Sequence, residues 1–191
     1  MSLDWTALSD GELAALSLAG RQAAFSEIMR RHEQAIYRLT RGCIGDADEA
    51  LDLSQETFVA AHRALARYDD ARPMRTWLSA IALNKCRDWT RRRKVRHFLS
   101  FAVPIGTDAE AVADTRVAVD DAAGDRQELD RVRRAITKLP ASLKEPLVLH
   151  AIEGLSQADT AAVLAISEKA VETRLYRARQ RLAGSLTRSG R

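Results

Sequence analysis

Residues 156–181 read SQADTAAVLAISEKAVETRLYRARQR. This pattern predicts two short helices joined by a tight turn, because the small Ala161 lets the helix axes approach and Ser167 can cap the second helix. Val171 and Leu175 are expected to anchor the second helix on the first. Such a geometry presents a helix to the major groove of DNA. The stretch therefore favours a DNA-binding helix-turn-helix over an ordinary helical hairpin with a basic surface.

The outward face of the second predicted helix carries side chains suited to DNA. Arginine can bond guanine bidentately, and threonine or tyrosine can reach a phosphate. Glu172 is the exception, since a carboxylate repels phosphate but can accept from a cytosine amino group. Arg177 and Thr173 are the stronger candidates for base contacts. The candidate DNA contacts on this helix are Lys169, Glu172, Thr173, Arg174, Tyr176, Arg177 and Arg179.

The rest of the 191-residue chain also favours helices. Glycine and proline are scarce, at nine and four, and no apolar-polar alternation of strand length stands out. A capping box at Ser9 predicts a first helix to about Leu18. Further helices are expected over about 21–41, 46–68 and 74–93, the second of them capped by Asp46. In the C-terminal part, helices are expected over about 126–138, 142–153, 156–164 and 168–186, and Gly154 is expected to end the second of these as a left-handed C-cap.

Helical periodicity fails between about residues 101 and 126, where glycine, proline and small acidic residues dominate. The sequence predicts a flexible acidic linker at 99–126, with a docked helix between 108 and 119 as the alternative. The predicted fold class is therefore all-α. It has two small helical domains, 1–98 and 127–191, on either side of the linker.

Charge and composition exclude several classes of protein. Residues 72–97 hold nine Lys or Arg against one acid, which suggests a surface for a polyanion, although a solvated helix face is the alternative. No signal peptide or membrane-spanning stretch is evident, so we expect a cytoplasmic protein. Cys43, Cys86 and four scattered histidines predict neither a disulfide framework nor a metal site, and no cofactor is expected. No nucleophile-base motif or glycine-rich phosphate loop indicates an enzyme.

Two further stretches resemble the extracytoplasmic-function (ECF) group of sigma-70 factors, the subunits that direct bacterial RNA polymerase to promoters. Residues 46–61 resemble the family's Asp-x-x-Gln-Asp/Glu-Thr-Phe segment, and residues 72–88 resemble its Trp-Leu-x-x-Ile-Ala-x-Asn segment. The helix-turn-helix is similar to the family's C-terminal domain, including RLYRAR at 174–179. The three motifs occur in the family's order and cover about 20–98 and 127–186.

The resemblance implies a non-enzymatic specificity subunit that serves a stress or envelope response. Its first domain would dock on the clamp coiled coil of the largest polymerase subunit, then read and melt the −10 element. Leu51 and Phe58 are expected in the core, as are Trp77 and Trp89, and Lys85 would have to extend out of an apolar sector. The implied polymerase contacts are Asp52, Gln55, Glu56 and Thr57. The implied −10 contacts are Arg75, Asn84, Lys85, Arg87, Arg91, Arg92 and Arg93.

The resemblance also implies partners beyond the polymerase. The second domain would bind duplex DNA near −35, and an anti-sigma factor, often membrane-anchored, would mask the polymerase-binding surfaces. No small-molecule substrate is expected. The acidic linker is predicted to mimic nucleic acid in the polymerase channels. The alternative function is a stand-alone helix-turn-helix regulator, which would bind duplex DNA by itself as a symmetric dimer.

Overall fold

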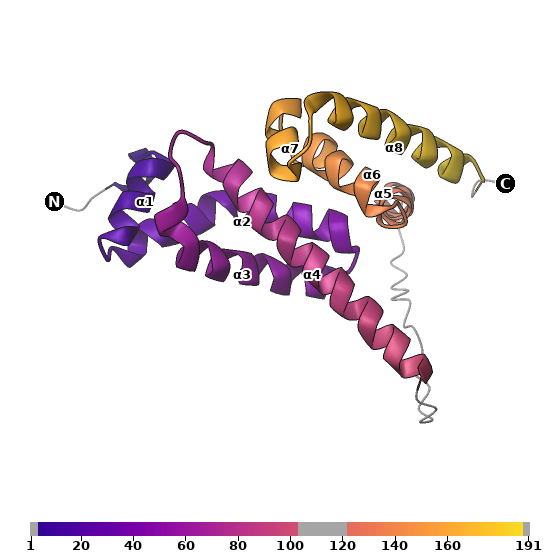
Figure 1. Ribbon diagram of the computed structural model, residues 1–191, viewed down its shortest axis with the longest axis horizontal. Helices are drawn as coiled ribbons and strands as arrows, with labels where there is room; N and C mark the ends of the chain where they lie inside the picture. Colours follow the sequence, from indigo (N-terminus) through magenta and orange to yellow (C-terminus); the bar gives the residue numbers. More distant parts are fainter. Residues whose placement is uncertain (1–3, 103–121, 189–191) are drawn as a thin grey trace.

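The fold is helical throughout the residues that this computed structural model describes, 4–102 and 122–188, and no strand occurs among them (Figure 1). This confirms the predicted all-α fold class. The helices of the N-terminal half are α1 (Asp10–Leu18), α2 (Gln22–Ile44), α3 (Ala47–Ala64) and α4 (Met74–Ala102), with 3-10 turns η1 (Trp5–Ala7) and η2 (Leu65–Arg67). The C-terminal half contains α5 (Ala122–Thr137), α6 (Ala141–Leu147), the π-helical segment η3 (Val148–Ile152), α7 (Gln157–Leu164) and α8 (Glu168–Arg188).

Caps that can be read in the sequence fix where the N-terminal helices begin and end. The Ser9 N–H donates to the Glu12 carboxylate at 2.7 Å, and the Ser9 hydroxyl accepts from the Glu12 N–H, which completes the predicted capping box. Asp46 caps α3 by accepting from the Glu49 N–H at 3.0 Å. Gly45 ends α2 in the left-handed conformation, at a φ of 88°, where glycine avoids the strain of a side chain.

Helices α2, α3 and α4 pack their apolar faces around the N-terminal core. The buried Thr40 hydroxyl lies 2.9 Å from the Ala50 carbonyl, so it joins α2 to the start of α3. Trp89 is buried, as expected, and its indole N–H donates to Glu49. Each fully buried leucine or isoleucine contributes about 1.5–3 kcal/mol to stability. The large fully buried side chains of this half include Leu13, Ile28, Ile36, Leu39, Leu53, Leu65, Leu78 and Leu83.

Leu51 does not belong to this core, so that prediction is wrong. Its exposed fraction is 50%, whereas Leu53 is 2% exposed. The buried face of α3 passes through Leu53 and the small polar Ser54, and Leu51 lies about 200° around the helix from Leu53. Phe58, the other expected core residue, is buried.

The helix predicted to end at Glu153 is not a regular α-helix. It widens after α6 into η3, and the Glu153 N–H donates to the Val148 carbonyl five residues back at 3.0 Å. A π turn holds one residue more than an α turn, so it changes the direction in which later side chains point. Gly154 then ends the segment with a φ of 66°, as its predicted capping role requires.

Helices α7 and α8 form the predicted helix-turn-helix. Ser156 and Ser167 cap the two helices, and each accepts from the N–H three residues further on. Val171 and Leu175 are almost fully buried and hold α8 against α7. Ala165 forms the turn with a left-handed φ of 53°, a conformation that costs a non-glycine residue about 1–2 kcal/mol.

The two halves of the molecule lie against each other (Figure 1). Segment η3 and helix α5 contact α2, and α7 contacts α4. Gly42 of α2 makes this approach close, because a Cβ added there would lie 3.1 Å from Val148 Cγ1 and 3.3 Å from Ile152 Cδ1. The described parts of the two halves are therefore packed together.

The domain boundaries stay a prediction. Helix α4 continues to Ala102 and α5 begins at Ala122, so both helices reach into the predicted linker at 99–126. The rest of that linker, including the alternative helix at 108–119, lies outside the described residues.

Candidate nucleic-acid and partner-binding surfaces

Helix α8 displays the predicted recognition face to solvent. Tyr176 is 63% exposed, and only Arg174 among the candidate contacts is half-buried. Lys169 donates to Glu172 at 2.7 Å, so the carboxylate among the predicted contacts is paired with a neighbouring ammonium. The exposed candidates are Lys169, Glu172, Thr173, Tyr176, Arg177 and Arg179. This face thus combines accessible donors with an acid that a neighbouring lysine compensates, which suits duplex DNA.

The predicted −10 contacts all lie on α4, where the basic ones point in several directions around the helix. Arg91 pairs with Asp88 at 2.9 Å, and Arg93 stacks over the Trp89 ring with 5.1 Å between its Cζ and the ring centroid. Lys85 is half-buried and pairs with Glu56 of α3 at 3.2 Å. The exposed members of the predicted set are Asn84, Arg87, Arg91, Arg92 and Arg93.

Two arginines of this set, Arg75 and Arg87, contact acidic residues of the C-terminal half. Arg87 donates twice to Glu145, at 2.9 and 2.6 Å, and Arg75 donates to Glu153 at 3.0 Å. The Glu145 carboxylate raises the pKa of the Arg87 guanidinium through these hydrogen bonds. Arg38 of α2 also donates to Glu153, at 3.2 and 3.3 Å. The structure therefore places part of the predicted DNA surface at the contact between the halves.

The predicted polymerase-binding face of α3 is only partly correct. Asp52, Gln55 and Glu56 are exposed and share one side of the helix. Thr57 is fully buried, and its hydroxyl donates to the Leu53 carbonyl at 2.7 Å. A side chain without accessible surface cannot contact a partner directly, so the prediction for Thr57 is corrected.

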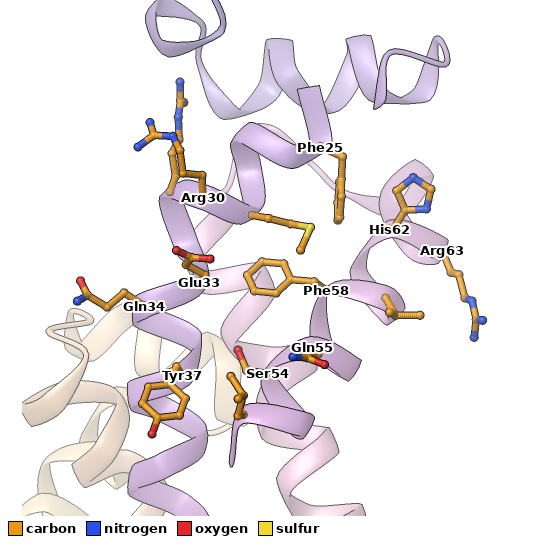
Figure 2. A pocket seen from close by; sticks show the side chains of 14 residues that line it. Phe25, Arg30, Glu33, Gln34, Tyr37, Ser54, Gln55, Phe58, His62 and Arg63 are labelled. Atoms are coloured by element: carbon orange, nitrogen blue, oxygen red, sulfur yellow. The ribbon is translucent and has the colours of Figure 1, made fainter. Parts of the chain in front are cut away.

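Beside this face, a groove of about 940 Å³ runs between α2 and α3. Figure 2 shows Phe25 and Phe58 near its middle, with Gln34 and Arg63 toward its edges. The apolar lining includes Met29, Leu51 and Val59, which are 37%, 50% and 51% exposed. A patch of exposed apolar side chains with a charged rim is typical of a protein-binding surface.

The two cysteines, far apart in sequence, are neighbours in the N-terminal core. A hydrogen bond with Cys43, followed by burial, raises the pKa of the Cys86 thiol. A thiol with a raised pKa supplies little of the thiolate that reacts with oxidants or metals. Nowhere in 4–102 or 122–188 do three or more His, Cys, Asp or Glu side chains gather in a way that could hold a metal ion.

Among the helices of those two ranges, none combines the length and the apolar character needed to cross a bilayer.

Sequence reasoning missed Glu145, Glu153 and Arg38, which lie at the contact between the halves. Glu153 follows an apolar run and Glu145 precedes Pro146, so both are acids on otherwise apolar helix faces. That pattern could have marked them as buried. It could not have paired them with Arg87, 58 positions away, or with Arg38, 115 positions away.

Two known families match parts of the chain. Residues 28–96 match Sigma-70 region 2, and residues 129–182 match Sigma-70 region 4. The first range holds most of the α2–α3 groove and the basic residues of α4, and the second holds the helix-turn-helix. A match to region 2 favours a sigma factor over a stand-alone helix-turn-helix regulator.

Curated relatives span nearly the whole chain. The RNA polymerase sigma factor CnrH of Cupriavidus metallidurans is 41% identical over 181 residues, which cover 93% of this chain and 94% of CnrH. The ECF RNA polymerase sigma factor SigM of Mycobacterium tuberculosis is 36% identical over 177 residues, or 92% of this chain and 83% of SigM.

Solved structures agree. CnrH in complex with the cytosolic domain of CnrY matches with a TM-score of 0.69 and 37% identity, over 93% of this chain and 97% of CnrH. The sigma factor RpoE of Bartonella quintana, in complex with the anti-sigma factor NepR, shares the fold, with a TM-score of 0.67 and 23% identity over 85% of this chain and 96% of RpoE. Together with the region 2 and region 4 matches, these relatives show that the chain belongs to the ECF group of the sigma-70 family of RNA polymerase sigma factors.

Proposed function

We propose that this sigma factor docks on the clamp coiled coil of core RNA polymerase through the exposed face of α3 and the adjoining α2–α3 groove. The observation that carries this proposal is the combination of a polar edge, formed by Asp52, Gln55 and Glu56, with the exposed apolar Leu51 and Val59. Apolar contact supplies affinity at the centre of an interface, and an acidic rim orients a basic partner.

Promoter reading is divided between the two halves in this proposal. Arg75, Asn84 and Arg87 contact the separated non-template strand at −10, while Arg91, Arg92, Arg93 and the more buried Lys85 bind its phosphates. Helix α8 enters the major groove near −35 and reads bases through Arg177 and Thr173. The protein performs no chemistry of its own and acts in the cytoplasm.

An anti-sigma factor is the proposed inhibitory partner. The related CnrH was solved with the cytosolic domain of CnrY bound. The α2–α3 groove of the present chain offers an apolar site of a size that a partner helix could fill. A protein bound there would block docking on the polymerase.

The test measures association with purified core polymerase by gel filtration and selective initiation by in-vitro transcription on a genomic library. Leu51→Asp should weaken association with core by about tenfold or more, since residues near the centre of an interface dominate its affinity, whereas Gln55→Ala, at the polar edge, should weaken it less. Glu128→Gln, an exposed acid on α5, is the matched control and should change neither readout. A wild-type chain that neither associates with core nor confers a start site would refute the proposed function.

A further inference from the structure

Two carboxylates of the C-terminal half are buried against arginines of the N-terminal half. The side chains of Glu145 and Glu153 are 10% and 1% exposed. Arg87 pairs with the first, and Arg38 and Arg75 with the second, through donor–acceptor distances of 2.6 to 3.3 Å. Both acids therefore find their cationic partners across the contact between the halves.

A buried carboxylate without a cation is unfavourable, because burial removes its hydration. These two acids avoid that cost in the closed arrangement by pairing, and they avoid it in an open arrangement by returning to water. Further polar contacts accompany the pairs: Lys144 donates to the Cys43 carbonyl at 2.8 Å, and Thr76 donates to Asp159 at 3.2 Å. The closed arrangement is thus held partly by polar contacts that water can replace, beside the apolar contact of Gly42 with Val148 and Ile152.

Two of the three arginines, Arg75 and Arg87, are among the proposed −10 contacts. A guanidinium offers the same fork of donors to a carboxylate and to a phosphate, so the two anions compete for it. Arg75 is incompletely satisfied in the closed arrangement, since its Nε is buried without a hydrogen-bond partner among the described residues. A nucleic-acid backbone that reached Arg75 would complete its bonding.

We propose that Glu145 and Glu153 form an acidic latch that pairs with Arg75 and Arg87 in the free chain, so that the guanidinium donors engaged by these acids become free for single-stranded DNA only when the halves separate. This inference rests on the proposed function, in which these two arginines contact the non-template strand. It adds that the chain restrains its own strand-binding surface without another protein.

Small-angle X-ray scattering of the full chain tests the latch directly. The double variant Glu145→Gln/Glu153→Gln should have a larger radius of gyration than the wild type at low salt, because the interdomain charge pairs are lost. Gly42→Leu should expand the chain independently, since a side chain at this position meets Val148 across the contact. Glu128→Gln, which alters an exposed pair on α5, should stay as compact as the wild type. Circular dichroism confirms that each variant is folded.

The second readout is fluorescence anisotropy with a short fluorescein-labelled single-stranded oligothymidine. Both opened variants should bind it about tenfold more tightly than the wild type, a gain equivalent to about 1.4 kcal/mol. Adding Arg87→Ala to the double variant should remove the gain, because the released arginine is then absent.

Opened variants that stay as compact as the wild type, or that expand without any gain in oligothymidine affinity, overturn the latch. The proposed function is judged separately, because association with core polymerase and selective initiation by the wild type do not depend on the compactness of the free chain. A wild-type chain that initiates selectively but is already expanded in solution refutes the latch and leaves the proposed function standing.

Discussion

The two surfaces that we propose for DNA binding differ in what contacts them. The proposed recognition face of α8 is open to solvent, and its Glu172 is paired with a lysine on the same helix. The proposed −10 surface on α4 is partly engaged, because Arg75 and Arg87 are held by acids of the other half. Duplex DNA can be met by a rigid exposed helix, whereas a separated strand exists only once the polymerase is in place. The difference suggests that the strand-binding surface is the one under control.

The largest expected effect tests whether the exposed face of α8 depends on the buried side chain of Leu175. Leu175→Ala should lower the free energy of unfolding by about 2–5 kcal/mol, because it leaves a cavity between α7 and α8. Leu129→Ala on α5 is the control, since this leucine is 54% exposed and its loss should cost less than about 0.5 kcal/mol. Urea denaturation followed by circular dichroism measures both. Equal costs for the two variants would contradict the role of Leu175 as an anchor.

A second experiment separates the proposed duplex-binding surface on α8 from the proposed strand-binding surface on α4 by function. In the free chain, Arg177→Ala should weaken binding to duplex promoter DNA by about tenfold to a hundredfold, equivalent to 1–3 kcal/mol. Arg87→Ala should leave duplex binding by the free chain unchanged, because Arg87 is paired with Glu145 in the free chain and lies outside α8. With core polymerase present, both substitutions should reduce transcription. Arg133→Ala, on the surface of α5, is the control. The contrast fails if Arg87→Ala weakens duplex binding by the free chain as much as Arg177→Ala does.

The smallest expected effect concerns an ion pair inside the N-terminal half, away from both proposed DNA-binding surfaces. Asp10 accepts from His32 at 2.9 Å and from Arg31 at 3.0 Å, and the His32 hydrogen bond is the main cause that lowers its pKa below the ordinary 3.8. A lowered carboxyl pKa stabilises the fold above the ordinary value, and this stabilisation is lost as the pH falls through the lowered pKa. Asp10→Asn should therefore cost about 1 kcal/mol at neutral pH and nothing in strong acid.

Thermal unfolding between about pH 7 and pH 2 measures this dependence, since the wild type and Asp10→Asn should converge on acidification. Asp130→Asn is the control in the other half, because its pair with Arg133 is exposed and on one helix. A constant difference between wild type and Asp10→Asn over the whole range would show that the carboxylate charge is not what stabilises this site.

Local signals made much of the fold predictable. Serines and aspartates at helix starts and glycines at helix ends act within a few residues, so the caps at Ser9, Asp46 and Gly154 could be read directly. The prediction that Leu51 is buried failed because the buried face of α3 includes Ser54 and Thr57. These two polar residues make the apolar stripe appear shifted around the helix. The sequence could therefore predict that this segment is a helix, but not which face of the helix packs into the core.

The candidate sites could also be predicted only in part. The exposed residues of α3 and α8 followed from helical spacing and from resemblance to the family. The groove between α2 and α3 did not, because it depends on which apolar side chains are left uncovered when the helices pack. The partners of Arg75 and Arg87 could not be predicted either, since they come from the other half of the chain.

The wide turn at η3 divides the latch into two unequal parts. Glu145 precedes this turn and Glu153 follows it. If the segment tightened to a regular α-helix, the register would change by one residue and Glu153 would swing by about 100° around the axis, while Glu145 kept its place. Arg75 could then be released before Arg87. Such stepwise release would let the advancing DNA strand break the closed form in two smaller steps, each with a lower barrier than a single concerted rupture.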